Sequence, residues 1–168
     1  MRGRSSEARI LWCSEQRKGI KLREPNDNLC EAYLKKSNSS LKAMNLNMGA
    51  GLYDWAVDGA YYARYHAVYA LLQKCGIESE IHDCTIALMR FLFEDRLTRQ
   101  LLNELENAKS QRIDLVYYTD RMVPKEDITR NIASAPQFVL HVEKIISSLN
   151  NIDEIQELRA RLRRIITP

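Results

Sequence analysis

"YYARYHAVYALLQKCGIESEIH", residues 61–82, is the stretch that decides the fold. It is rich in alanine and contains no glycine or proline before Gly76. At helical spacing, five alanines in and just before it share one narrow face, which lets a neighbouring helix approach closely: Ala56, Ala60, Ala63, Ala67 and Ala70. A helix this apolar around its circumference is usually central in its domain. We therefore predict a central helix from about Leu52 to Cys75, ended by Gly76.

Helical spacing continues on both sides of this segment. It predicts a helix after the candidate caps Asn26, Asp27 and Asn28, which ends at Gly49 or Gly51. Three more helices are predicted. One begins after Ser79, one covers residues 98–120, and one follows the "NNID" of residues 150–153. No convincing run of alternating polar and apolar residues occurs, so no sheet is expected. The fold class predicted is all-α, an antiparallel up-and-down bundle of four to six helices.

The most regular apolar spacing in the chain follows "RMVPKED", residues 121–127. Steps of four and three separate the apolar residues Ile128, Ile132, Ala135, Val139, Val142, Ile146 and Leu149. Such steps are typical of the buried seam of a helical bundle. Pro136 lies within this segment, where it removes one backbone hydrogen bond and is expected to kink the helix.

Length and charge indicate one domain with basic ends. A chain of 168 residues can bury a sizeable core, and its formal net charge of +3 does not by itself indicate nucleic-acid binding. Basic residues gather near both ends, including "RARLRR" at 159–164. We expect a basic extension over residues 1–24, a bundle over 25–150 and a basic amphipathic helix over 151–168, its arginines mainly solvated.

No uncharged run approaches the length of a membrane span, and the apolar patch "ILWC" at residues 10–13 is too short for a signal-peptide core. A cytoplasmic protein without a membrane partner is expected. Its cysteines, Cys13, Cys30, Cys75 and Cys84, form no C-x-x-C pair and no zinc spacing. Reduced, mostly buried thiols are the expectation, with no metal and no cofactor.

The usual enzyme signatures are absent, including the P-loop, the dinucleotide-binding glycines, G-x-S-x-G and H-E-x-x-H. Of the three histidines, His82 falls in a first helical turn and His141 is favoured as a structural residue. Tyr62 and His66 are four residues apart and share a helix face, where they are either structural or part of a binding site. Arg64 lies on a different face of the same helix.

The segment "AYYARYHAVYALLQKCGIESEIH", residues 60–82, resembles the central signature of the prokaryotic HEPN domains. The resemblance continues through "QRIDLVYY" at 111–118 and "ITRNIASAPQFVLHVEKII" at 128–146, and it covers about residues 26–150. It implies an antiparallel helical bundle that is often dimeric. It also implies a frequent pairing with a minimal nucleotidyltransferase in a toxin–antitoxin arrangement, and RNase activity without a metal in some branches.

The nuclease branches of that family carry an arginine, four to six further residues and then a histidine, and no histidine here has an arginine at that distance upstream. The leading hypothesis is therefore a non-catalytic, homodimeric HEPN-type module that binds a nucleotidyltransferase, with a nucleotide or RNA as a second candidate ligand. Its candidate contact residues are Tyr62, His66, Arg112 and Tyr117, with no catalytic residue assigned. Two alternatives stay open. One is an RNase that uses His66, Arg112 and a tyrosine, and the other is a structural dimer without a ligand.

Overall fold

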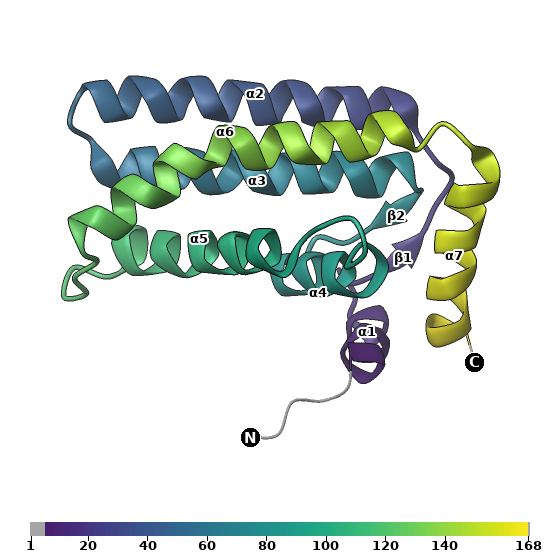
Figure 1. The fold of residues 1–168 in the computed structure, drawn as a ribbon. Helices are drawn as coiled ribbons and strands as arrows, with labels where there is room; N and C mark the ends of the chain where they lie inside the picture. The colour runs from purple at the N-terminus through teal and green to yellow at the C-terminus, as the bar shows by residue number, and fades with distance from the viewer. Residues whose placement is uncertain (1–5, 168) are drawn as a thin grey trace.

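The structure is a computed structural model that describes residues 6–167, so residues 1–5 and 168 lie outside the described residues. The described part is almost entirely helical, which confirms the predicted all-α fold (Figure 1). Its elements in chain order are α1 (Ser6–Glu15), β1 (Lys21–Leu22), α2 (Asp27–Gly49), α3 (Tyr53–Lys74), β2 (Ile77–Glu78), α4 (His82–Leu92), α5 (Arg99–Tyr117), α6 (Lys125–Ser148) and α7 (Ile152–Ile166). None of these helices is both long and apolar enough to cross a membrane.

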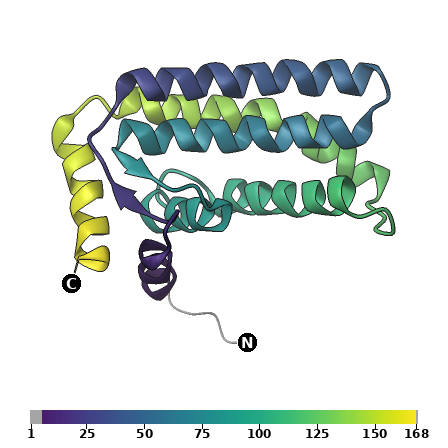
Figure 2. The same cartoon turned by 180° about the vertical axis from the view of Figure 1, so that it is seen from behind.

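Four long helices, α2, α3, α5 and α6, lie side by side as a bundle, and α7 crosses one end of it (Figures 1 and 2). The seven helices among residues 6–167 are one more than the upper limit predicted from the sequence. Helix α3 contacts α2, α5 and α6, so it is the central helix of the bundle. The predicted span of about Leu52 to Cys75 agrees with α3 to within one residue at each end.

The alanine face explains why α3 is central. All five alanines of that face are fully buried. Next to them, a Cβ atom on Gly59 would lie 3.0 Å from the backbone nitrogen of Met44 in α2, so the two helices meet at close range. The Ser37 hydroxyl, also on α2, donates a hydrogen bond of 2.7 Å to the carbonyl of Ala63. Small residues on α3 thus bring the two helices into contact.

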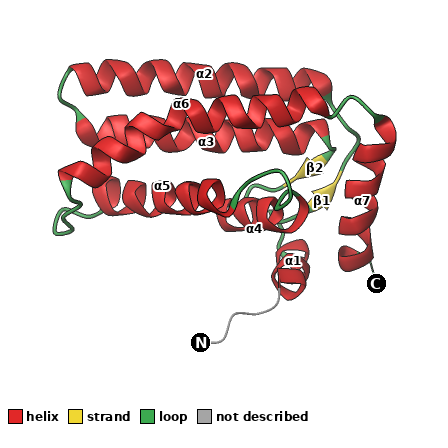
Figure 3. Cartoon of the chain, in the orientation of Figure 1, coloured by secondary structure: helices red, strands yellow, loops and turns green. Residues whose placement is uncertain are grey.

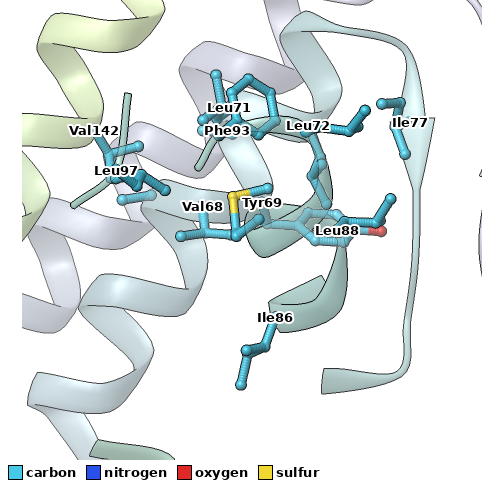
Figure 4. Close-up of a cluster of buried hydrophobic side chains, with 14 of the residues drawn as sticks. Val68, Tyr69, Leu71, Leu72, Ile77, Ile86, Leu88, Phe93, Leu97 and Val142 are labelled. Atoms are coloured by element: carbon cyan, nitrogen blue, oxygen red, sulfur yellow. The ribbon is translucent and has the colours of Figure 1, made fainter. Parts of the chain in front are cut away.

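The main core extends from α3 toward the end of the bundle where α4 packs (Figure 4). The side chains labelled in that view come from α3, β2, α4, the α4–α5 link and α6: Val68, Tyr69, Leu71, Leu72, Ile77, Ile86, Leu88, Phe93, Leu97 and Val142. The seam predicted for residues 128–149 is buried at each of its seven positions. Helix α6 runs through Pro136 without ending, and its first half is inclined to its second half in Figure 1.

The first described residues pack on the bundle rather than extending from it. Helix α1 contacts α4 and α7, and Ile10, Cys13 and Ile20 are buried in the main core. Cys13 forms a disulfide with Cys84 of α4, their Cα atoms 5.7 Å apart. The expectation of four reduced thiols is therefore wrong for this pair. The other two cysteines are free and buried, as predicted.

A short two-stranded ladder joins the N-terminal segment to the turn after α3, where no sheet was expected (Figure 3). The strands are antiparallel, with Lys21 opposite Glu78 and Leu22 opposite Ile77. Two residues on each strand are too few to produce a detectable alternating pattern in the sequence. The ladder fixes the chain that leads into α2 beside the end of α3.

Helix α7 exposes Arg163 and Arg164 to solvent, but it buries Arg159. Arg159 is 6% exposed, and its Nη1 donates to three carbonyl oxygens, those of Arg23 at 2.6 Å, Cys75 at 2.9 Å and Gly76 at 3.0 Å. Gly76 has a φ of +66°, and a Cβ atom there would overlap Arg159 and Arg23. Glycine is thus required both by the backbone conformation and by the approach of the arginine. This contact is named the Gly76–Arg159 junction below.

Candidate functional site

Arg112 of α5 connects three other side chains on one side of the bundle. Its Nε donates to Asp58 Oδ1 at 2.7 Å, and its Nη2 donates to the hydroxyl oxygens of Tyr62 at 3.1 Å and Tyr117 at 3.0 Å. Asp58 and Tyr62 are four residues apart on α3, so they share the face that looks toward α5. The cluster made of Asp58, Tyr62, Arg112 and Tyr117 is called the Arg112 cluster.

Aromatic rings surround the guanidinium of Arg112. Its Cζ lies 4.8 Å from the ring centre of Tyr62, 5.3 Å from that of Tyr117 and 5.5 Å from that of Tyr61, which is within cation–π range. Burial lowers the pKa of Arg112, but the hydrogen bond to Asp58, the charge of Tyr62 and the hydrogen bond to Tyr117 outweigh it and raise the pKa above its ordinary value. Arg112 is therefore a positive charge held in a fixed position.

His66 lies next to the Arg112 cluster but does not join its hydrogen bonds. Its ring centre is 5.6 Å from that of Tyr62, and its Nδ1 shares a hydrogen bond of 3.3 Å with the Ser40 hydroxyl of α2. Burial, and after it the charge of Lys36, lowers the pKa of His66 below 6.5. The imidazole is therefore neutral at physiological pH. The ring of Tyr62 thus contacts both His66 and Arg112.

A groove of about 380 Å³ opens between α2 and α3 beside these residues. It is lined by Ser40, Ala43, Asn47, Trp55, Asp58, Gly59, Tyr62 and His66. Trp55 is 58% exposed, which is unusual for an indole and leaves its ring free to stack on a ligand. Arg112 of α5 does not line the groove but donates hydrogen bonds to two of its lining residues, Asp58 and Tyr62. This cavity is called the Trp55 groove.

The structure brings the four residues predicted from the sequence into one neighbourhood. Tyr62, Arg112 and Tyr117 share direct hydrogen bonds, and His66 is connected to them through the Tyr62 ring. Sequence reasoning missed Asp58 and Trp55. Asp58 could have been found, because it precedes Tyr62 by one helical turn on the same face.

His82 has a larger part in this region than its position in a first helical turn indicated. The hydroxyl of the buried Tyr61 and Nδ1 of His82 share a hydrogen bond of 2.6 Å, and the rings of His82 and Tyr65 stack with centres 4.1 Å apart. Burial, and after it the charge of Arg112, lowers the pKa of His82 below its ordinary value. Burial also raises the pKa of Tyr61, so its hydroxyl remains protonated.

His141, the third histidine, has the structural role that the sequence favoured. Its Nε2 shares a hydrogen bond of 2.9 Å with the backbone carbonyl of Arg96, in the link between α4 and α5. Within residues 6–167, no group of three or more His, Cys, Asp or Glu side chains could hold a metal ion.

We expect the free energy of unfolding to fall as the pH is lowered below about 6.5, because both His66 and His82 have lowered pKa values in the folded state. The unfolded chain takes up these protons first, so acid favours unfolding, and stability is highest above the ordinary histidine pKa. Urea unfolding between about pH 7 and about pH 5 measures this slope. A His66→Gln, His82→Gln double variant should have a flatter slope, and an unchanged slope would contradict the assignment.

The chain is thus a helical module, and its aromatic groove beside a fixed arginine is a candidate binding surface. The chain matches the HEPN domain over residues 30–161, from within α2 to within α7, and it belongs to this family. The resemblance indicated by the sequence is thereby confirmed. A comparison with curated proteins found no match.

Proposed function

We propose that the chain is a non-catalytic HEPN module that works as a homodimer with a minimal nucleotidyltransferase, in a toxin–antitoxin-like system, and that the Trp55 groove contacts a nucleotide or RNA. The family supports the dimer and the protein partner. The observation that supports the contact surface is the Arg112 cluster, in which a fixed positive charge lies beside a groove with an exposed indole.

Unpaired nucleotides are bound by aromatic rings that stack on bases and by cations that attract phosphates. In the Trp55 groove, the rings of Trp55 and Tyr62 are available to stack on bases. Arg112, which is hydrogen-bonded to Tyr62, supplies the cation that attracts phosphates. Because the pKa of His66 is lowered, His66 adds a charge for a phosphate only toward acid pH. RNA affinity should therefore rest on Arg112 and the rings at neutral pH.

The same geometry supports binding over cleavage. The alternative RNase pairs His66 as acid or base with Arg112 as the group that stabilises the charge on the phosphorus. Within the described residues the two side chains share no hydrogen bond, and each contacts Tyr62. Asp58 and the two tyrosines engage Nε and Nη2 of Arg112, which leaves a phosphate the attraction of its charge and Nη1 rather than a bidentate contact.

The test is fluorescence anisotropy with a labelled single-stranded RNA oligonucleotide, at two salt concentrations. Arg112→Met should weaken binding about tenfold or more, since it removes a charge-assisted contact of about 1.5–3 kcal/mol. The matched control is Arg90→Met, which removes an exposed arginine paired with Glu106 on a different surface. Equal losses in both variants would mean that net charge alone attracts the RNA, and the groove proposal would be wrong.

The recovered RNA is then analysed on a denaturing gel, and intact RNA is expected. Cleavage that His66→Ala abolishes without unfolding the protein would replace this proposal with the RNase. Sedimentation in the same buffer tests the dimer, and a monomer at high micromolar concentration would contradict that part. No RNA binding by the wild-type protein, together with a dimer, would leave the structural dimer without a ligand as the better account.

A further inference from the structure

A second and larger cavity, of about 650 Å³, lies between α3, α5 and α6 and shares no lining residue with the Trp55 groove. Its volume falls within the range of small-molecule sites, about 300–1,000 Å³. Its lining combines apolar residues, such as Ala108 and Val123, with buried polar side chains from α3 and α6. The polar residues that carry the argument are Arg64, Gln111 and Asn131.

Arg64 lines this cavity and is fully buried without a carboxylate partner among the described residues. Its Nη1 donates to the carbonyl of Ala60 at 3.1 Å, and its Nη2 donates to the carbonyl of Asn131 at 2.7 Å and to the Ser134 hydroxyl at 2.8 Å. Its Nε has no hydrogen-bond partner within residues 6–167. Burial lowers the pKa of Arg64 to about 10, which still leaves it charged at neutral pH.

Asn131 supplies the complementary group on the same wall. Its Nδ2 donates to Gln111 Oε1 at 2.8 Å, while its Oδ1 has no hydrogen-bond partner in the described part of the chain. Asn131 is 8% exposed. A buried donor on Arg64 and a buried acceptor on Asn131 are thus both unmatched, which is costly for a folded protein. Both atoms belong to residues that line the cavity.

The charges around the cavity argue against an ionic ligand. Its lining holds three acidic residues, Glu104, Asp114 and Asp127. Two basic residues, Arg64 and Arg130, also line it, so its net charge is negative and disfavours an anion. The buried positive charge of Arg64 repels a cation. A neutral molecule avoids both penalties and still satisfies the unmatched donor and acceptor.

We propose that this cavity binds a small neutral molecule with a carboxamide or lactam edge. The carbonyl oxygen of such an edge accepts a hydrogen bond from Arg64 Nε, and its adjacent N–H donates to Asn131 Oδ1. The rest of the molecule packs against Ala108 and Val123. This site is separate from the Trp55 groove, and neither proposal depends on the other.

Nicotinamide and uracil are the probes, because each has a carboxamide or lactam edge, and nicotinate is the matched anion. Titrations of ¹⁵N-labelled full-length protein are followed by NMR. Nicotinamide and uracil should shift the Arg64 Nε–H signal and the Asn131 side-chain amide signals in a saturable way, and the Trp55 indole N–H signal should stay in place. Nicotinate should bind about tenfold more weakly or not at all.

Two variants locate the site. Arg64→Lys keeps the charge but removes Nε, and should weaken nicotinamide binding about tenfold or more. Because a change at a buried arginine can prevent folding, Val123→Phe serves as the second variant: Val123 lines the cavity at a half-buried position outside the helices, so the larger ring should fill the cavity and abolish binding with the fold intact. Arg90→Met, which changes a residue outside the cavity lining, should bind like the wild type. Shifts that do not include Arg64 Nε–H, equal binding of nicotinate, or full binding by Val123→Phe would each overturn the proposal.

Discussion

Arg159→Met should lower the free energy of unfolding by about 3–5 kcal/mol, because it removes the hydrogen bonds to the carbonyl oxygens of Arg23, Cys75 and Gly76, of which the last two are buried. Methionine keeps most of the apolar length of the side chain, so the change isolates the hydrogen bonds at the Gly76–Arg159 junction. The backbone of Gly76 is already constrained by its positive φ, which leaves it little freedom to turn its carbonyl toward water. Urea unfolding followed by circular dichroism measures the loss.

Arg163→Met is the matched control. It lies on the same helix, one turn further along, and its side chain is exposed. Its effect should stay within about 0.5 kcal/mol, as for most surface substitutions. Similar losses in the two variants would show that α7 is stabilised by its overall charge, and the role given to Arg159 would be wrong.

Replacing both Cys13 and Cys84 with alanine should lower the free energy of unfolding by about 4 kcal/mol. The disulfide closes a loop between positions 71 residues apart, and the chain-entropy relation for a loop of that length gives about 4.4 kcal/mol. The loss should come mainly from the unfolded state, which becomes freer. Comparing urea unfolding of the oxidised wild type and the double variant measures it.

The paired control is the Cys30→Ala, Cys75→Ala variant, which removes the two free thiols and keeps the disulfide. Burial raises the pKa of Cys30 to about 11 and that of Cys75 to about 12, so neither thiol reacts readily in the folded protein. Thiol labelling of the denatured, oxidised wild type should detect only these two cysteines. Labelling of all four without a reductant would contradict the disulfide.

Helices α2 to α7 were predictable because each one is encoded locally, whereas α1 lies in the segment expected to be a basic extension. The alanine face of α3 and the buried seam of α6 follow from spacing alone, and the structure buries both. The Cys13–Cys84 bond was not predictable in this way, since it depends on α1 packing against α4, and no local pattern encodes that contact. Arg159 was misjudged for a similar reason, because the carbonyls it binds belong to distant segments.

The candidate site was predictable in part. Helical periodicity placed Tyr62 and His66 on one face of α3, and the family resemblance indicated Arg112 and Tyr117. Which side of α5 lies against α3 is decided by tertiary packing, so the contact between Arg112 and Asp58 could not be read from spacing. The unmatched atoms of Arg64 and Asn131 were also out of reach, because α3 and α6 meet there across 67 residues of sequence.

The Gly76–Arg159 junction also bears on the order of events during protein synthesis. Arg159 is translated 83 residues after Gly76 and 136 residues after Arg23, whose carbonyls it binds. At about 5–20 residues per second, the ribosome adds Arg159 about 4–17 s after Gly76. Throughout that interval the nascent chain lacks Arg159, so the Gly76 carbonyl has only its hydrogen bond from the backbone N–H of Arg23, and the Cys75 carbonyl stays hydrated. The Gly76–Arg159 junction at this end of the bundle therefore forms only after α7 has been translated.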